Sequence, residues 1–274
     1  MRLHGKVAII TGGGGGLGRE TAFRFVKEGA CVVIADINQE SGIDTIKMIR
    51  TELPEYDNCI TYYKCDVSKQ DEMKLLISYT ESVYHKVNII FNNASIMMNT
   101  DKSLIETDDN TFDRTYEVNV KGTFYGCKFG IQALRRAGGG VIINVSSFVS
   151  IIGSAVPQIA YTASQGAILS MTKELAAVHA KENIRFIPLC PGHYKTSKMM
   201  NSLFRNIKEN TNLDALEESD DEDDFENMND DKYVNLDKCV HMECMFNKRT
   251  NKYIPVKVNE KARVISKNDL LKNN

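Results

Sequence analysis

The sequence predicts an α/β protein built on a doubly wound parallel sheet. In residues 1–200, short β-branched apolar runs alternate with segments of helical periodicity, which is typical of strands joined by crossover helices. The first apolar run is followed by five consecutive glycines and then by a helical segment, as expected where a strand, a tight turn and a helix meet. The chain has 274 residues, 42% of them apolar, so it is long enough to bury a core. A ligand of such a sheet is expected at the carboxyl ends of its strands.

Six strands are expected because six runs are almost continuously apolar, as strands covered on both faces are. These runs are Val7–Thr11, Cys31–Asp36, Ile60–Asp66, Val87–Asn92, Val141–Ser146 and Ile184–Leu189. Helices are expected in the segments between and after them, at Gly18–Glu28, Gln39–Arg50, Lys69–His85, Thr111–Ala137 and Tyr161–Glu182.

The composition argues against several classes of function. The 34 basic and 36 acidic residues give a net charge of −2, which argues against a nucleic-acid partner. No run approaches the ~18 apolar residues of a membrane span, and the first residues form a strand pattern rather than a leader, so we expect a cytoplasmic protein. The seven cysteines are odd in number and four lie in or beside apolar runs, so we interpret them as reduced thiols rather than a disulfide framework.

The turn after the first strand has the spacing of a dinucleotide site. It contains Gly12, Gly16, Leu17 and Gly18. The three glycines can supply the tight turn, the close approach of the backbone to a phosphate and the packing of helix on strand. Five consecutive glycines can also form a flexible linker, but their position between a strand and a helix favours the phosphate turn.

The second expected strand ends at Asp36, 18 residues after Gly18. An acid at about this distance binds the adenosine ribose in dinucleotide sites, and a carboxylate repels a 2′-phosphate. Asp36 therefore favours NAD over NADP, although a strand-end Asp can also simply cap a turn. Arg19, on the first helical turn, could attract a phosphate or be solvated.

Further motifs follow in order along the chain and strengthen this interpretation. Asp66 and Val67 follow the third strand, and the fourth ends in Asn-Asn-Ala-Ser at 92–95. The series continues with Asn119 in YEVNVKG, Ser146 and Ser147 in INVSS, Tyr161 in AYTASQ, and Pro191-Gly192 before Thr196. Together with the glycine turn, it resembles the short-chain dehydrogenase/reductase family over roughly residues 1–200, with Ser95 in place of that family's Gly.

The resemblance implies a Rossmann-type, NAD-dependent oxidoreductase that interconverts a secondary alcohol and a ketone by hydride transfer. Tyr161 would exchange a proton with the substrate oxygen. Ser147, 14 residues before Tyr161, would hold that oxygen, whereas Ser146 would face the sheet. Asn119 would hold a water that links the site to solvent. The implied coenzyme-binding residues are Gly12, Gly16, Leu17, Gly18, Asp36, Asp66, Val67, Asn93, Tyr161, Gln165, Pro191, Gly192 and Thr196.

The main departure from the family is at position 165. The family's catalytic motif is YxxxK, whereas in this chain the residue four positions after Tyr161 is Gln165. The family's lysine binds the nicotinamide ribose and places a cation near the tyrosine, and Gln165 can do only the first. A phenol of pKa ~10 is ionised to about one part in a thousand at pH 7, a deficit worth at most roughly 4 kcal/mol. We therefore expect weakened catalysis that favours reduction. The missing cation could come from Lys195 or Lys198. His193 could likewise enter the site.

Residues 201–274 form an atypical C-terminal segment that does not match the family. All 18 glycines lie at or before Gly192. Ser197–Lys208 is helical enough to begin a substrate flap, and the acidic run Glu217–Glu226 is expected to be disordered or to bind a basic partner. The segment is either a genuine extension or unrelated to the family's C-terminus. The family's last strand and helix are expected to be missing or replaced.

Two short patterns in this segment are weak. Cys239, His241 and Cys244 lack a second ligand pair, so we expect no metal site. Tyr253–Val258 and Lys261–Ser266 could pair as a hairpin. Because Pro255 lies inside it, such a hairpin would replace a buried strand poorly.

Two functions compete, together with a third outcome. The first is an oxidoreductase for a small alcohol or ketone, weakened by Gln165, and the second is an NAD-binding sensor or scaffold without catalysis. The third is a chain that does not fold stably because its sheet is incomplete. Gly122 and Gly126, on one face of the helix expected at 111–137, allow packing against a second copy, but packing within the chain explains them equally well.

Overall fold

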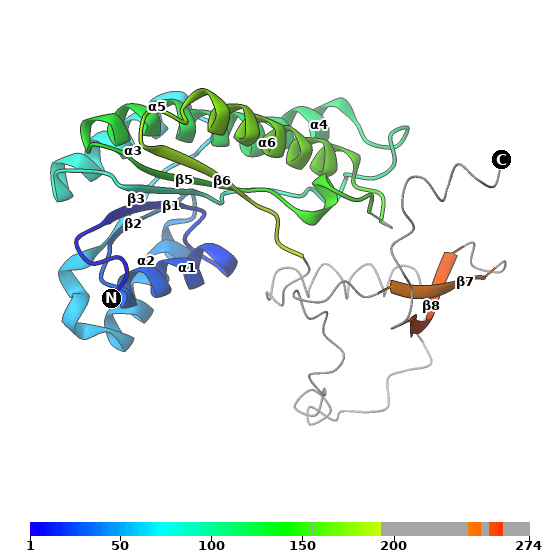
Figure 1. The fold of residues 1–274 in the computed structure, drawn as a ribbon, viewed down its shortest axis with the longest axis horizontal. Coiled ribbons are helices and arrows are strands. Elements are labelled where there is room, and N and C mark those ends of the chain that lie inside the picture. The colour runs from blue at the N-terminus through cyan, green and yellow to red at the C-terminus, as the bar shows by residue number, and fades with distance from the viewer. Residues whose placement is uncertain (155, 193–240, 248–251, 260–274) are drawn as a thin grey trace. The chain divides into compact units, whose positions relative to one another are not determined.

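The computed structural model describes residues 1–154, 156–192, 241–247 and 252–259, the last two ranges by backbone alone. The chain divides into two compact units, Met1–Asn210 and Thr211–Asn274. The first unit holds a parallel sheet in the order β3-β2-β1-β4-β5-β6, as the sequence predicts for a doubly wound fold (Figure 1). Its strands are β1 (Val7–Thr11), β2 (Cys31–Asp36), β3 (Ile60–Lys64), β4 (Ile89–Asn92), β5 (Gly140–Val145) and β6 (Ile184–Leu189).

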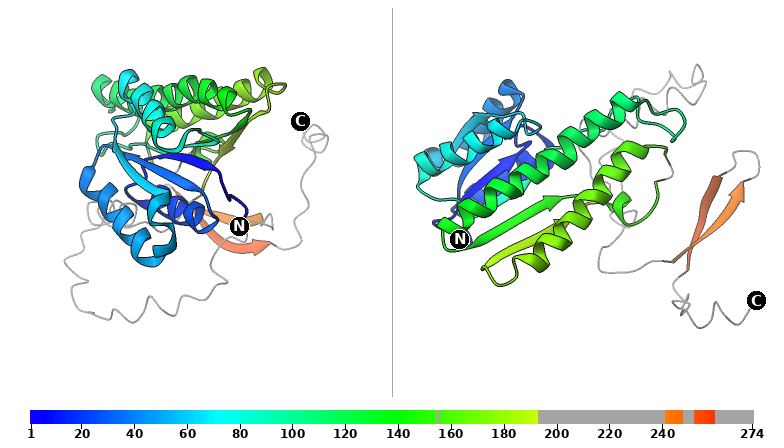
Figure 2. Two further views of the ribbon diagram at one scale, coloured as in Figure 1. Left: turned by 90° about the vertical axis from the view of Figure 1, so that its left-hand side faces the viewer. Right: turned by 90° about the horizontal axis from the view of Figure 1, so that it is seen from above.

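Helices cover both faces of this sheet (Figures 1 and 2). One face is covered by α1 (Gly16–Lys27) and α2 (Gln39–Glu52). The other is covered by α3 (Gln70–Tyr84), α4 (Asp109–Tyr116), α5 (Gly122–Arg136) and α6 (Ile159–Val178). Because helices cover both faces, alternate strand residues enter two different hydrophobic clusters. In β1, Ile9 belongs to one cluster, whereas Ala8 and Ile10 belong to the other. This explains why the strands read as continuous apolar runs.

Side chains and local chemistry define the helix ends. Asn38 caps α2 by accepting from the backbone N–H of Ser41 at 3.0 Å, and Asp108 caps α4 by accepting from that of Thr111 at 2.8 Å. A 3₁₀ helix, η1 (Pro54–Cys59), begins with a proline, whose fixed φ suits a first helical turn.

The helix expected at 111–137 is present from Asp109 to Arg136, but it contains a π-helical turn that was not expected. Between α4 and α5 lies a π-helical turn, η2 (Glu117–Lys121), which contains Asn119. The Asn119 side chain bonds backbone groups of a loop outside the helix, and such wider turns are typical of functional positions.

Several expected strand bounds differ by one or two residues. The third strand ends at Lys64 rather than Asp66, because the N–H of Asp66 donates to the Glu72 carboxylate at 2.7 Å and the chain turns into α3. The fourth begins at Ile89 rather than Val87, and the fifth spans Gly140–Val145 rather than Val141–Ser146.

The second unit contains an antiparallel pair, β7 (His241–Asn247) and β8 (Lys252–Asn259). β8 contains the expected strand Tyr253–Val258 and pairs with β7. The register shifts between Glu243 and Cys244, where Pro255 is paired with Cys244. Proline has no N–H to donate, so an irregularity is expected beside it. The expected segments 197–208, 217–226 and 261–266 lie outside the described residues.

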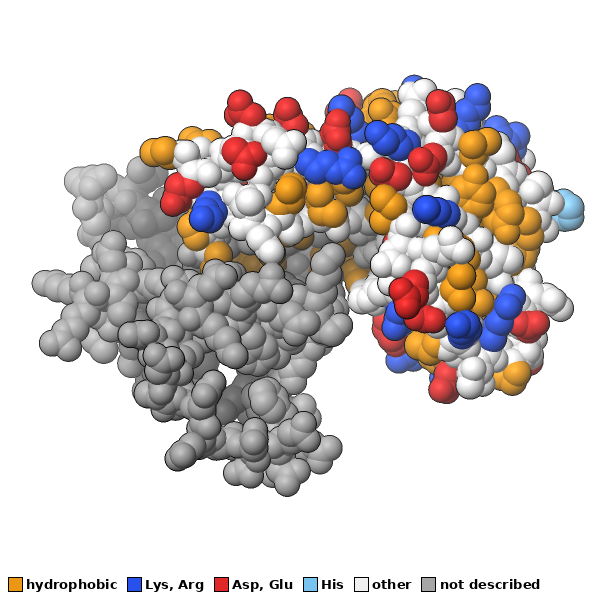
Figure 3. Space-filling view, turned by 180° about the vertical axis from the view of Figure 1, so that it is seen from behind, with side chains coloured by type: hydrophobic (Ala, Val, Ile, Leu, Met, Phe, Trp, Pro, Cys, Tyr) orange, Lys and Arg blue, Asp and Glu red, His pale blue; other side chains and the backbone are white. Residues whose placement is uncertain are grey.

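The part of the chain that the structure describes has no helix suited to span a membrane, and one of its faces carries mixed charge. None of its helices is long and apolar enough to cross a membrane. On the face shown in Figure 3, Lys and Arg side chains are interspersed with Asp and Glu.

Candidate active site

The predicted site residues gather at the carboxyl ends of the strands. The strand order reverses between β1 and β4, and doubly wound sheets bind their ligands at this point. Gly12 follows β1, Asn93 follows β4, and Ser146 follows β5. The fold thus brings together segments that are far apart in the sequence.

The turn after β1 is closely packed against the loop after β4. Gly12 has φ +64°, and a Cβ there would lie 2.9 Å from the Cα of Ala94. The side-chain nitrogen of Asn93, Nδ2, donates to the backbone oxygens of Thr11 at 3.0 Å and of Gly12 at 3.1 Å. A Cβ on Gly18 would collide with the Gly12 oxygen and the Asn93 side chain. Only glycine therefore allows this approach of helix to strand.

The amino terminus of α1 has the properties of a phosphate site. Its N-cap is Gly15, which forms no side-chain cap, and its first turn contains no acidic residue. The first N–H groups of the helix thus remain available for an anion. Leu17 packs against the hydrophobic cluster on this face of the sheet and anchors the turn.

Asp36, the last residue of β2, faces the glycine turn. Its carboxylate accepts from the N–H of Gly14 and from the N–H of Asn38, both at 2.9 Å. Two bonds leave acceptor capacity on a carboxylate, which has about four lone-pair positions. Arg19 is held by the oxygen of Gly14 at 2.7 Å and by the hydroxyl of Thr45 at 2.9 Å, rather than being merely solvated.

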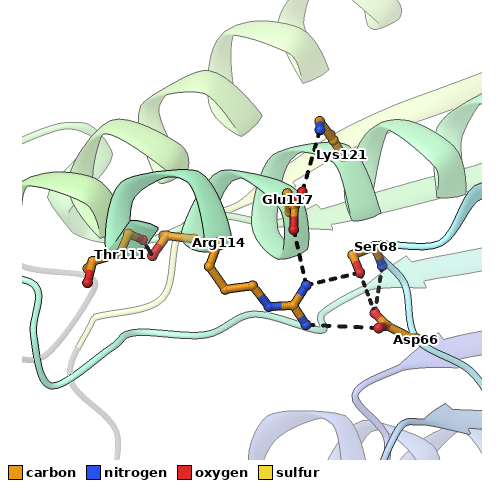
Figure 4. Close-up of polar contacts among 7 residues, drawn as sticks. Asp66, Ser68, Thr111, Arg114, Glu117 and Lys121 are labelled. Atoms are coloured by element: carbon orange, nitrogen blue, oxygen red, sulfur yellow. Dashed lines mark hydrogen bonds and ion pairs between the residues drawn. The ribbon is translucent and has the colours of Figure 1, made fainter. Parts of the chain in front are cut away.

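Asp66 is joined to the helices beside it by a polar network (Figure 4). Its Oδ1 accepts from the hydroxyl of Ser68 at 2.7 Å, and its Oδ2 lies 3.9 Å from the guanidinium of Arg114 in α4. Arg114 also contacts Ser68 at 3.3 Å and Glu117 at 3.2 Å. Val67, the next residue, is buried in the cluster on the other face.

Asn119 joins the π-helical turn to the loop after β4 and to α6. Its Oδ1 accepts from the N–H of Ile96 at 2.8 Å. Its Nδ2 donates to the Ile96 oxygen at 2.9 Å and to the Ser164 hydroxyl at 3.0 Å. Asn119 is fully buried, and both hydrogens of its amide are used. The side chain therefore positions these three segments.

The two serines after β5 have different environments. The Ser146 hydroxyl donates to the backbone oxygen of Gln165 in α6 at 2.9 Å. Ser147 is the N-cap of a short 3₁₀ turn, η3 (Phe148–Ser150), and its hydroxyl accepts from the N–H of Val149 at 3.4 Å. The N–H of Phe148 donates to the oxygen of Pro191 at 3.1 Å, so the segment after β6 borders this turn.

Tyr161 lies in the first turn of α6, which is capped from a distant loop. The Asp101 carboxylate accepts from the N–H of Ala160 at 3.0 Å and from that of Tyr161 at 2.8 Å. Asp101 is only 7% exposed. Ser164 connects the same turn to Asn119, because its hydroxyl donates to the backbone oxygen of Tyr161 at 2.7 Å.

Gln165 is buried beside Tyr161 with one end of its amide unpartnered. It is 1% exposed, and its Nε2 lies 3.4 Å from the hydroxyl of Ser95. Its Oε1 has no hydrogen-bond partner within the described structure. Buried polar atoms usually have partners, so an unpartnered oxygen here fits a site that a polar ligand completes. The two positions at which the sequence departs from the family motifs, 95 and 165, are thus in contact.

Three residues of this site are not evident from the sequence. Ser95 stands out there only as a substitution for a glycine, and neither Asp101 nor Arg114 belongs to a motif. Asp101 caps a helix that begins more than 50 residues later, so no local pattern indicates its role. Arg114 could have been found only from its contacts with Asp66 and Ser68, which lie more than 40 positions earlier in the chain. The remaining candidates Thr196, His193, Lys195 and Lys198 lie outside the described residues. Within the described residues, no group of three or more metal-ligating side chains occurs.

Comparison with known proteins identifies relatives over most of the chain. The family profile described as short chain dehydrogenase matches residues 6–208. The 3beta-hydroxysteroid dehydrogenase 2 of Eggerthella lenta is 34% identical over 71% of this chain and 73% of its own. The secoisolariciresinol dehydrogenase of Forsythia intermedia is 36% identical over 69% of this chain and 66% of its own. The crystal structure of levodione reductase superposes with a TM-score of 0.72 at 27% identity, covering 76% of this chain and 80% of the other.

Proposed function

Because the chain belongs to the short-chain dehydrogenase/reductase family, we propose that it is an NAD-dependent oxidoreductase that interconverts a secondary alcohol and a ketone. The observation that carries the proposal is the glycine turn at the reversal point of the sheet, where side chains on Gly12 and Gly18 would collide with neighbouring atoms. The relatives named above as dehydrogenases of a hydroxysteroid and of secoisolariciresinol support an alcohol as substrate.

The coenzyme would lie along the strand ends. The uncapped N–H groups of α1 would hold its pyrophosphate, and the remaining lone pairs of Asp36 would accept from the adenosine ribose hydroxyls. Asp66 would contact the adenine, and the free oxygen of Gln165 would accept from the nicotinamide ribose. The other proposed contacts are Gly12, Gly16, Leu17, Gly18, Val67, Asn93, Tyr161, Pro191, Gly192 and Thr196.

The proposed chemistry is carried by Tyr161 and Ser147. When bound, the nicotinamide exchanges a hydride with the substrate carbon. Tyr161 donates a proton to the substrate oxygen in reduction and accepts it in oxidation, while the Ser147 hydroxyl holds that oxygen. Asn119 fixes the start of α6 through Ser164, and so keeps the phenol in place.

A second candidate function is coenzyme binding without useful catalysis. Gln165 favours it, because an amide replaces the cation that would favour the tyrosinate. The coenzyme turn does not depend on that cation, so binding can persist where proton transfer is slow.

Calorimetric titration with NAD and NADP, followed by hydride transfer to a panel of ketones, tests both candidates. We expect NAD to bind more tightly than NADP and the ketone reaction to proceed slowly. Binding without hydride transfer to any ketone selects the second candidate, whereas failure of both coenzymes to bind overturns the proposal.

The Asp36→Asn variant tests the coenzyme preference. We expect it to lose roughly tenfold or more in NAD affinity and to reduce the difference between NAD and NADP, because the charge that repels a 2′-phosphate is gone. Glu40→Gln, an exposed charge change in the first turn of α2, serves as the matched control in the same titration. Equal affinity of the unchanged protein for both coenzymes would contradict this role of Asp36.

A further inference from the structure

Two half-buried cysteines face each other at the end of the sheet opposite the coenzyme turn. Cys31 is the first residue of β2, and Cys59 directly precedes β3. The register pairs Val32 with Ile60, so the two cysteines are the preceding neighbours on adjacent parallel strands. Both are free thiols, and their sulfur atoms lie 2.9 Å apart.

This geometry allows a disulfide without a change in strand pairing. Adjacent strands are separated by ~4.8 Å, which lies within the Cα separations of roughly 4.4–6.8 Å found across disulfides. The sulfurs need to approach by less than 1 Å from 2.9 Å to reach the covalent distance of ~2.05 Å. Both residues are partly exposed, so an oxidant can reach them.

The other described cysteines have different surroundings. Cys65 and Cys127 are buried, and the Cys65 sulfur lies 3.6 Å from that of Met73 and the Cys127 sulfur 3.6 Å from the side-chain oxygen of Asn144. Cys190 lies 3.9 Å from the hydroxyl of Ser150. A disulfide between described residues is therefore specific to one pair.

We propose that Cys31 and Cys59 form an oxidisable disulfide site that links the edge strand β3 to β2. β3 lies at one edge of the described parallel sheet, so β2 is its single neighbouring strand there. The bond joins residues 28 positions apart and thereby restricts the unfolded chain. It forms far from Tyr161 and Gln165 in the fold, so this inference does not depend on the proposed function.

Glutathione disulfide is a suitable oxidant, and the reaction balances in two exchanges. One cysteine thiolate attacks a sulfur of glutathione disulfide and releases one glutathione thiolate. The second cysteine thiolate attacks the resulting mixed disulfide and releases the other. The cysteines lose two electrons, glutathione gains them, and the two thiol protons end on two glutathione thiols.

Peptide mapping of the full-length protein after overnight incubation with glutathione disulfide tests the site. Tryptic peptides 28–47 and 51–64 each contain one cysteine, Cys31 and Cys59 respectively. We expect them to be recovered as one linked species, lighter than the sum of the reduced peptides by two hydrogen atoms. Recovery of separate peptides, or of peptides that carry glutathione, would overturn the proposal.

Thermal unfolding measures the consequence for stability. We expect oxidation to raise the unfolding midpoint by roughly 5–10 °C and dithiothreitol to reverse the change. Cys31→Ser and Cys59→Ser should each abolish the increase, whereas Cys190→Ser should retain it. A linked species with an unchanged or lower midpoint, or a retained increase in either variant of the pair, would refute stabilisation through this bond.

Discussion

At the scale of single residues, we expect the side chain at position 165 to determine how easily Tyr161 gives up its proton. We expect Gln165→Lys to raise the rate of alcohol oxidation at pH 7 by up to about a thousandfold, because a nearby cation stabilises the tyrosinate. Reduction should change much less, since the phenol already carries its proton. Rates measured in both directions across pH 6–10 would show oxidation losing its steep rise above pH 9. Gln165→Met, which adds no charge, is the control and should leave oxidation slow. An unchanged rate and profile in Gln165→Lys would contradict this role.

At this scale the sequence predicted residues within motifs, but not their partners. Gly12, Asp36 and Tyr161 follow patterns that extend over a few residues or a fixed spacing, so they could be found without a structure. The contact of Ser95 with Gln165 spans 70 positions, and that of Asp101 with Tyr161 spans 60. Such pairs arise only when strand order places two loops side by side, and no local pattern encodes that.

Among the secondary-structure elements, α5 packs on β4 through a glycine that has no room for a side chain. A Cβ on Gly126 would collide with the buried side chain of Asn92. We expect Gly126→Ala to lower the free energy of unfolding by about 1–3 kcal/mol, measured by denaturant titration. Gly166→Ala in α6 is a matched control, because a Cβ there meets no atom within 4 Å. It should be neutral or stabilise by up to about 1 kcal/mol. Equal effects of the two variants would show that the contact is unimportant.

The carboxyl-terminal ends of α5 and α6 are joined through Glu182. Its carboxylate accepts from Arg135 at 2.7 Å and from His179 at 3.0 Å, and these bonds lower the pKa of Glu182 to about 2. A depressed carboxyl pKa contributes stability above the unfolded value, about 4.5, that is lost as the pH falls toward 2. Glu182→Gln should therefore lower the unfolding midpoint at pH 7, with a difference that shrinks between pH 4.5 and pH 2. Glu174→Gln on α6 provides the comparison, and a constant difference across this range would contradict the linkage.

For the whole molecule, the success of sequence prediction follows the hydrophobic pattern. Residues 1–192 alternate apolar strands with helices, so the six strands and their parallel, doubly wound arrangement could be predicted. The π-helical turn at 117–121 could not, and neither could the bonds of its residue Asn119 to another loop. The strand β7 was also not predicted, since it overlaps a Cys/His pattern without regular alternation.

The division of the chain leads to a prediction for the whole molecule. Both hydrophobic clusters, all six strands of the parallel sheet and every residue proposed to bind the coenzyme belong to the unit Met1–Asn210. We expect a chain that ends at residue 210 to unfold cooperatively and to bind NAD within about twofold of the full-length affinity, because it keeps the elements that stabilise the sheet. Circular dichroism melts and calorimetric titration of both chains measure this. A loss of cooperative unfolding would show that residues 211–274 complete the core, whereas a folded chain with much weaker NAD binding would place part of the coenzyme site in that segment.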